Sequence, residues 1–148
     1  MGVLLIAASA FQALIQYRRA ALESRVRYTF DVLNNFEMIL PSELEVQKIV
    51  NEFIDPKEES KITKNEREAF YQYLNTLERL SLGVRKGILE EEIIREYLET
   101  YLIDAYNTTK PYINLQRENW DDLEHSVPYS DLEALARRWS ERRQSNVS

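Results

Sequence analysis

The side chains that could carry out catalysis or bind a metal are few in this sequence and lie far apart. The chain has one histidine, His125, and no cysteine. A serine or cysteine triad needs a histidine beside its nucleophile, and most zinc sites need histidine or cysteine ligands. His125 lies in the polar stretch HSVPYS, which is typical of a solvated loop. We therefore expect a protein that is not an enzyme and has no cofactor.

Acidic residues are the next candidates, because carboxylates bind divalent cations. Glu90, Glu91 and Glu92 are consecutive, however, and consecutive residues of a helix point in different directions. They are better explained as the first turn of a helix, where carboxylates interact favourably with the positive end of the helix dipole. Asp104 and residues 121–122 have no metal-ligand spacing, and the sequence has no glycine-rich phosphate loop. The sequence identifies no metal site and no small-molecule substrate.

One pair of opposite charges lies beside apolar residues. Glu78 follows Asn75 by three residues in a predicted central helix, and Arg117 lies between Ile113 and Trp120. Our hypothesis is that Glu78 and Arg117 form a partly buried ion pair that fixes how the central helices meet the C-terminal ones. Such a pair contributes to specificity more than to stability. The alternative is that they are two unrelated, exposed charges.

The stretch 75–97 encodes the ends of two helices and the turn between them. Apolar residues recur there at spacings of three and four, which predicts one apolar helix face, at Phe70, Leu74, Leu77 and Val84. Gly87 suits the left-handed position just after a helix end. Gly83, one turn earlier, is predicted to let a neighbouring backbone approach closely. Because the apolar pattern resumes at Ile93, we expect an antiparallel αα-hairpin at the centre of the fold.

The segment Val3–Ile15 is apolar almost all round. As a helix it would be about 20 Å long, short of the roughly 30 Å hydrocarbon core of a bilayer. Tyr17, Arg18 and Arg19 follow it, in the order of an interfacial aromatic residue and a cytoplasmic basic flank. Three interpretations stay open: a short membrane anchor with membrane contact through residues 3–19, a helix buried against a partner subunit, and an ordinary core helix. The protein would accordingly lie at the inner face of the cytoplasmic membrane or in the cytoplasm.

The N-terminal helix is predicted to cover residues 1–40. Its apolar residues follow a seven-residue rhythm, at Ile15, Leu22, Val26, Thr29, Leu33, Phe36 and Leu40. This rhythm is typical of a seam that faces either a coiled-coil partner or the rest of the domain. Tyr28, Phe30 and Val32 widen the apolar face, which favours packing within a bundle.

Residues 41–143 are predicted to form a bundle of about five helices, so the fold class is all-α. A Ser or Thr followed three residues later by Glu is the capping-box pattern of a helix start. It occurs at Ser42, Thr63 and Ser130. We expect these residues to start the first, second and last helices of the bundle, of which the first covers Glu43–Ile54.

The third and fourth bundle helices are predicted to be separated by a break. The pattern favours one helix over 90–106, an interruption before Pro111, and another helix to about Leu123. The last helix carries an apolar stripe that ends with Trp139, and residues 144–148 are expected to be frayed.

Charge is distributed unevenly along the chain, whose formal net charge is −6. Residues 1–27 carry four arginines and one glutamate, whereas residues 28–125 carry 11 basic and 21 acidic side chains. An acidic body argues against nucleic-acid binding, which needs a basic surface. The N-terminal basic residues are candidates for anionic lipid headgroups and equally for solvated charges, at Arg18, Arg19, Arg25 and Arg27.

Three segments together carry a family resemblance: LNTLERLSLGVRKGILEEEIIREYL, then PYINLQRENW and a closing LEALARRW. They resemble small helical bacterial and prophage proteins that are catalogued only as a domain of unknown function. The resemblance covers roughly residues 10–143 and rests on Asn75, Glu78, Gly83, Gly87, Arg117 and Trp139. It implies one N-terminal membrane helix ahead of a cytosolic helical domain. Val3–Ile15 would correspond to the end of that helix, although it is shorter here. No catalytic residue is assigned in such a family, so the resemblance supplies none.

We therefore expect a non-enzymatic protein-interaction or regulatory module of bacterial or prophage type, close to a membrane. The alternative is a soluble homo-oligomer that modulates a host protein, for example a defence protein. In that case Val3–Ile15 and the seam Leu22–Leu40 would be buried against a second copy. An enzyme acting through carboxylates would instead need a concave site containing Glu78 and a second acid.

Overall fold

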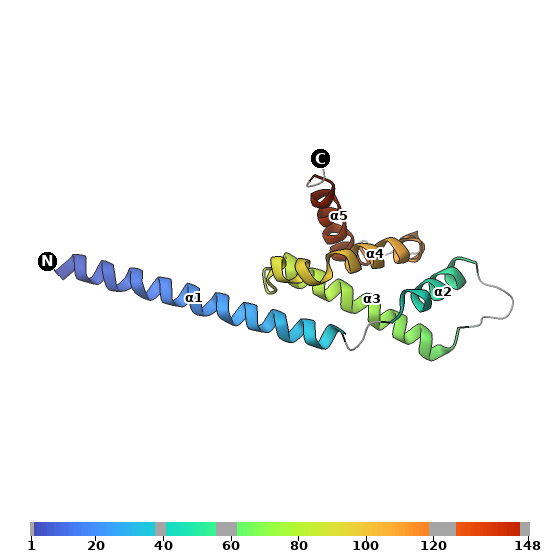
Figure 1. The fold of residues 1–148 in the computed structure, drawn as a ribbon, viewed down its shortest axis with the longest axis horizontal. Coiled ribbons are helices and arrows are strands. Elements are labelled where there is room, and N and C mark those ends of the chain that lie inside the picture. Colours follow the sequence, from blue (N-terminus) through green and yellow to red (C-terminus); the bar gives the residue numbers. More distant parts are fainter. Residues whose placement is uncertain (1, 38–40, 56–61, 119–126, 146–148) are drawn as a thin grey trace.

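The computed structural model describes residues 2–37, 41–55, 62–118 and 127–145. These residues form five helices and no strand: α1 (Gly2–Glu37), α2 (Glu43–Ile54), α3 (Lys64–Arg85), α4 (Glu91–Glu118) and α5 (Ser130–Ser145). The predicted all-α fold, a long N-terminal helix followed by a helical bundle, is confirmed (Figure 1).

Helix α1 is 36 residues long, about 54 Å at the usual rise of 1.5 Å per residue. Its C-terminal part lies against α4, and its N-terminal part projects away from the other four helices (Figure 1). The sequence predicted that this helix continues to residue 40. Residues 38–40 lie outside the described part of the chain.

Helices α2 and α3 begin at two of the predicted capping boxes. The Glu45 N–H donates to the Ser42 hydroxyl at 3.3 Å, and the Ser42 N–H donates to the Glu45 carboxylate at 2.9 Å. Thr63 and Glu66 form the same reciprocal pair at 3.2 and 2.7 Å. Hydrogen bonds from the Thr63 backbone and hydroxyl hold the pKa of Glu66 at about 2. These bonds satisfy N–H groups that have no partner within their own helix.

The turn between α3 and α4 closes the end of α3. Gly87 has a φ of 66°, the left-handed conformation predicted for it. Its N–H donates to the carbonyl of Val84 at 3.0 Å, and the Ile88 N–H donates to the carbonyl of Gly83 at 2.9 Å. This pair of bonds is a Schellman motif, which satisfies carbonyls left free at a helix C-terminus.

Helix α4 runs without interruption through Pro111, where the sequence predicted a break between two helices. A proline inside a helix removes one backbone hydrogen bond and costs about 3 kcal/mol or more. Buried side chains on both sides of it, Tyr106, Tyr112 and Ile113, hold the helix in the bundle and offset this cost. The prediction was wrong because it used only the local signal of the proline. Residues 119–123, the end of the predicted separate helix, lie outside the described residues.

Helices α3 and α4 form an antiparallel hairpin and meet through large side chains. Phe70, early in α3, packs against Tyr112, late in α4, with ring centroids 5.0 Å apart. Nearer the turn, the Tyr101 hydroxyl donates to that of Tyr73 at 3.2 Å. Helix α2 adds Phe53 to the aromatic cluster, 4.8 Å from Tyr112, and α5 contacts both α3 and α4.

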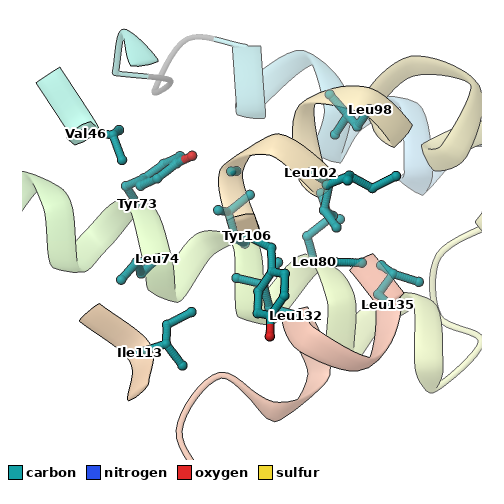
Figure 2. Close-up of a cluster of buried hydrophobic side chains, with 14 of the residues drawn as sticks. Val46, Tyr73, Leu74, Leu80, Leu98, Leu102, Tyr106, Ile113, Leu132 and Leu135 are labelled. Atoms are coloured by element: carbon teal, nitrogen blue, oxygen red, sulfur yellow. The ribbon is translucent and has the colours of Figure 1, made fainter. Parts of the chain in front are cut away.

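The core lies where α2, α3, α4 and α5 converge. Figure 2 shows buried side chains from all four helices pointing toward one another, among them Val46, Leu74, Leu80, Leu102, Ile113, Leu132 and Leu135. Among its described side chains, helix α1 adds two further apolar ones that are buried, Leu33 and Phe36. The bundle thus has its own core, to which α1 is attached by its C-terminal part.

Candidate interaction site

Thr29 joins α1 to the start of α4. Its fully buried hydroxyl donates to the Arg25 carbonyl at 2.8 Å and accepts the N–H of Glu90 at 2.9 Å. Glu90 directly precedes α4, so α1 supplies a cap for a helix that comes 61 residues later. Arg25 adds an ion pair of 2.6 Å with the Glu90 carboxylate. The base of α1 is therefore fixed in direction relative to α4.

On the N-terminal side of Arg25, the described side chains of α1 are exposed. The large apolar ones have exposed fractions of 47% at Leu14, 37% at Ile15, 73% at Tyr17 and 48% at Leu22. Apolar side chains that stay in water do not stabilise a fold, so this half of α1 is the best candidate for an interaction surface.

The predicted seven-residue seam is divided into two parts. Leu33 and Phe36 are buried in the bundle and Val26 is half-buried, as expected for packing within a domain. Leu22 and Ile15 continue the same helix face and are exposed. The C-terminal part of the seam is therefore packed against the bundle, and its N-terminal part is exposed to solvent.

The four N-terminal arginines have different environments. Arg25 pairs with Glu90 and also donates to the Gly87 carbonyl at 3.4 Å, so it is used within the fold. Arg18, Arg19 and Arg27 are exposed, and within the described part of the chain none of them has a hydrogen-bonding or ion-pair partner. These three remain candidates for an anionic partner.

A second junction joins α5 to α3 through Glu78. The two carboxylate oxygens of Glu78 accept the backbone N–H groups of Asp131 at 3.1 Å and of Leu132 at 2.7 Å. The N–H of Glu133 donates to the Tyr129 carbonyl at 3.2 Å, which places Tyr129, with its φ of 57°, at the cap position. Glu78 thus acts as the capping side chain of α5. Burial raises its pKa, and the two backbone hydrogen bonds oppose that rise.

Arg117 binds the same segment from the other side. Its guanidinium donates to Glu133 at 2.6 Å and to the Pro128 carbonyl at 2.9 and 3.0 Å. The hydrogen bond from Arg117 lowers the pKa of Glu133. Our hypothesis paired Arg117 with Glu78; the structure instead gives each its own partner in the segment 128–133. The N–H groups at the start of α5 have no acceptor within their own helix, and Glu78 accepts two of them.

The start of α5 therefore differs from its prediction. We expected Ser130 and Glu133 to form a capping box, but the Glu133 side chain binds Arg117 and Arg137. A carboxylate from α3 takes the capping role instead, because the fold brings Glu78 to these N–H groups.

Further contacts hold α5 along its length. Arg85, in the last turn of α3, donates through Nε and Nη2 to the two carboxylate oxygens of Asp131, the latter bond being 3.2 Å long. Trp139 is fully buried and its indole N–H donates to Glu91 at 2.9 Å. The glutamates at the start of α4 were explained in the sequence by the helix dipole. One of them, Glu91, also accepts a hydrogen bond from α5.

Gly83 and Asn75 are two further residues of α3 that were identified from the sequence. Gly83 is buried, and a Cβ built on it would lie 2.8 Å from Cδ1 of Leu89. The close neighbour is thus a side chain, whereas the sequence predicted a backbone. Asn75 is exposed on α3.

Comparison with known proteins gives a family for this chain. The family described as "Domain of unknown function (DUF4760)" matches residues 3–139. The chain belongs to this family. A search of curated proteins and a search of solved structures each found no match. The predicted membership of a family catalogued as a domain of unknown function is thereby confirmed.

Two surface depressions of this DUF4760 chain are relevant to α1 and α4. The first, about 350 Å³, is an apolar groove between α1 and α3, lined among others by Tyr28, Val32, Arg79 and Ile88. The second, about 590 Å³, lies on α4 beside the end of α5 and is lined by Glu92, Ile93, Arg95, Glu96, Tyr97, Glu99, Thr100 and Arg143. We call the second depression the acidic hollow.

The described residues contain no metal site and no membrane-spanning helix. No group of three or more His, Asp and Glu side chains there could hold a metal ion. His125 and residues 121–122 lie outside the described part of the chain. Among the helices that the structure describes, none has both the length and the apolar composition needed to cross a bilayer.

Sequence reasoning missed several residues of these junctions. Thr29 had been assigned only to the apolar seam, and no local signal shows that its hydroxyl would cap α4. Asp131 and Arg85 carry opposite charges at the ends of two helices, which is a usable signal, but only the fold brings them together. Trp139 was predicted to end the apolar stripe of the last helix, but its acceptor Glu91 was not identified.

Proposed function

We propose that this protein is a non-enzymatic protein-interaction module in which α1 is the binding element and the α2–α5 bundle is its support. The observation that carries the proposal is the projecting half of α1, with exposed apolar side chains at Leu14, Ile15, Tyr17 and Leu22. Exposed apolar residues that share one element of a soluble protein commonly mark a binding surface.

The base of α1 is built to hold that element in a fixed direction. Leu33 and Phe36 are buried, and the Phe36 ring meets Tyr101 of α4 edge-on, with centroids 6.2 Å apart. Thr29 and Arg25 add a hydrogen bond and an ion pair at Glu90. A helix held in this way loses little orientational freedom when it binds a partner, which favours affinity.

The polar clusters of the bundle support a binding role over catalysis. Glu78 accepts two backbone N–H groups of α5, and Arg117 is used by Glu133 and a backbone carbonyl. These groups organise the fold through contacts that a reacting substrate would have to break. If the module is regulatory, it would act by binding a partner protein through α1 and changing that partner's activity.

Site-specific photo-crosslinking in the cells that make the protein tests this proposal. A photoreactive phenylalanine is placed at Tyr17, and the matched control carries it at Leu44, which is 80% exposed on α2. We expect protein adducts from position 17 that are absent from position 44. Equal labelling at both positions, or no protein adduct at position 17, would contradict an interaction role for α1.

A second candidate is a module that is anchored at the inner face of the cytoplasmic membrane through its N-terminal helix, as the bacterial and prophage resemblance implies. It is favoured by Tyr17, Arg18 and Arg19, which are exposed and follow the apolar segment Val3–Ile15. Carbonate and detergent extraction of the full chain, beside a chain that starts at Arg18, separates the two candidates. A full chain that stays in the membrane through carbonate, with a shorter chain that is soluble and folded, supports the membrane candidate.

A further inference from the structure

The projecting half of α1 carries a basic stripe. Ile15, Arg18, Arg19 and Leu22 follow the spacing i, i+3, i+4, i+7, so they share one helix face. The two arginines lie between the two apolar residues. All four side chains are exposed, and within the described residues neither arginine has a polar partner.

The acidic hollow on α4 has the complementary pattern. Ile93, Glu96, Tyr97 and Thr100 repeat the same i, i+3, i+4, i+7 spacing, and Glu99 lies beside them. Tyr97 is 59% exposed. Glu96 and Glu99 have no ion pair among the described residues, whereas Glu92 nearby is neutralised by Arg95 at 2.6 Å. Of the two bases that line the hollow, Arg95 is paired with Glu92, and Arg143 of α5 has no ion pair within the part of the chain that the structure describes. The surface therefore offers apolar side chains together with two carboxylates that lack a partner.

The basic stripe cannot reach the acidic hollow of its own chain. Helix α1 runs beside α4 in the same direction, since Arg25 meets Glu90 and Phe30 packs on Tyr97 with centroids 6.2 Å apart. Residues before Arg25 therefore extend past the start of α4, away from Glu96. Because α1 is one continuous helix, it does not fold back. Only another molecule can bring these two surfaces together.

We propose that a second copy of this chain is the partner of α1, with the basic stripe of each copy seated on the acidic hollow of the other. This inference rests on the proposed interaction role of α1. The hollow borders α1 at Phe30 and Tyr97, so the two α1 helices would run antiparallel, side by side over the two α4 helices. The charge difference between the basic N-terminal segment and the acidic body supplies the attraction, and it makes association weaker at high salt.

Two charge-reversed chains test this interface. The first carries Arg18→Glu and Arg19→Glu, and the second carries Glu96→Arg and Glu99→Arg. In either chain alone, stripe and hollow have the same sign, so we expect the dissociation constant of the homodimer to rise about 10- to 100-fold. In a mixture of the two, each stripe meets a hollow of opposite sign, so a heterodimer should form with near wild-type affinity.

Analytical ultracentrifugation of the wild type, each variant and the mixture gives the readout, and circular dichroism checks that each chain is folded. Matched controls are Arg79→Glu and Glu141→Arg, which reverse exposed charges outside the stripe and the hollow. A dimeric wild type, weakened variants and a restored mixture support the proposal. A wild type that is dimeric but insensitive to both reversals overturns this interface.

A wild type that stays monomeric at all concentrations overturns the second copy as partner. Photo-crosslinking at Tyr17 then tests the interaction role of α1 separately. Adducts to other proteins would support that role without a second copy, and the absence of adducts would contradict the role itself. Flotation with phosphatidylglycerol vesicles is run on the same samples. A monomer that floats through Arg18 and Arg19 assigns the stripe to a membrane and overturns the proposal.

Discussion

The carboxylate of Glu78, in the middle of α3, accepts the backbone N–H of Leu132, in the first turn of α5, at 2.7 Å. These residues are 54 positions apart, and Leu132 itself is fully buried. A helix start that lacks a capping side chain of its own is thus completed by another helix. The capping of the first turn of α5 therefore depends on one side chain of α3.

Replacing Glu78 by Ala should lower the free energy of unfolding by about 1–2 kcal/mol, because two N–H groups of α5 lose their acceptor. Glu78→Gln should recover part of this loss, since its amide oxygen accepts one of the two bonds. Urea denaturation followed by circular dichroism measures both. Glu68→Ala removes an exposed carboxylate from the same helix and is the control. A Glu78→Ala variant as stable as this control would contradict the capping role.

A comparable prediction applies to Thr29, at the junction of α1 with the start of α4. Thr29→Val keeps the shape of the side chain but leaves the N–H of Glu90 without its acceptor, which should cost about 1–3 kcal/mol. Thr29→Ser keeps the hydroxyl and should cost clearly less. Amide hydrogen exchange at Glu90 gives a local measurement: exchange should be faster in the valine variant and close to wild type in the serine variant. The same exchange rate in both variants would mean that the hydroxyl does not hold this N–H.

Local signals in the sequence were sufficient for much of the fold. The boxes at Ser42 and Thr63 and the glycine at position 87 act within one or two turns, so their residues identify the helix ends without any tertiary information. Pro111 shows the limit of such signals. Its cost is local, but the burial of Tyr112 and Ile113 that offsets it depends on the other helices.

The candidate site was predictable only in part. Glu78 and Arg117 were identified because charges beside apolar residues need partners. Their partners are backbone groups and Glu133, which lie in a segment that periodicity alone could not place in space. The sequence also could not show that the α1 seam is buried only on the C-terminal side of Val26. A seven-residue rhythm is the same whether the seam packs within one chain or between two chains.

Gly83 and Leu89 should be energetically coupled. In the wild type, Gly83→Ala places a Cβ 2.8 Å from Cδ1 of the buried Leu89, so the gain of about 1 kcal/mol in helix propensity is opposed by a steric cost. In a Leu89→Ala background the cost is removed, and Gly83→Ala should be stabilising. A double-mutant cycle by urea denaturation measures the coupling. If the effect of Gly83→Ala were the same in both backgrounds, the two side chains would not be in contact.

The contribution of Glu133 to stability should depend on pH in one direction. Its hydrogen bond from Arg117 lowers its pKa in the folded protein below the ordinary value of 4.5. A carboxyl with a lowered folded pKa stabilises the protein fully above its unfolded pKa, and this stabilisation is lost as the pH falls through the folded pKa. Glu133→Gln should therefore be less stable than the wild type at pH 7, with a difference that shrinks below about pH 4.5. Urea denaturation of both proteins over this pH range measures the difference between their free energies of unfolding. The other carboxyl groups titrate in both proteins, so their contributions cancel from this difference. A difference that stayed constant down to pH 3 would show that the Arg117–Glu133 contact does not favour the ionised carboxylate.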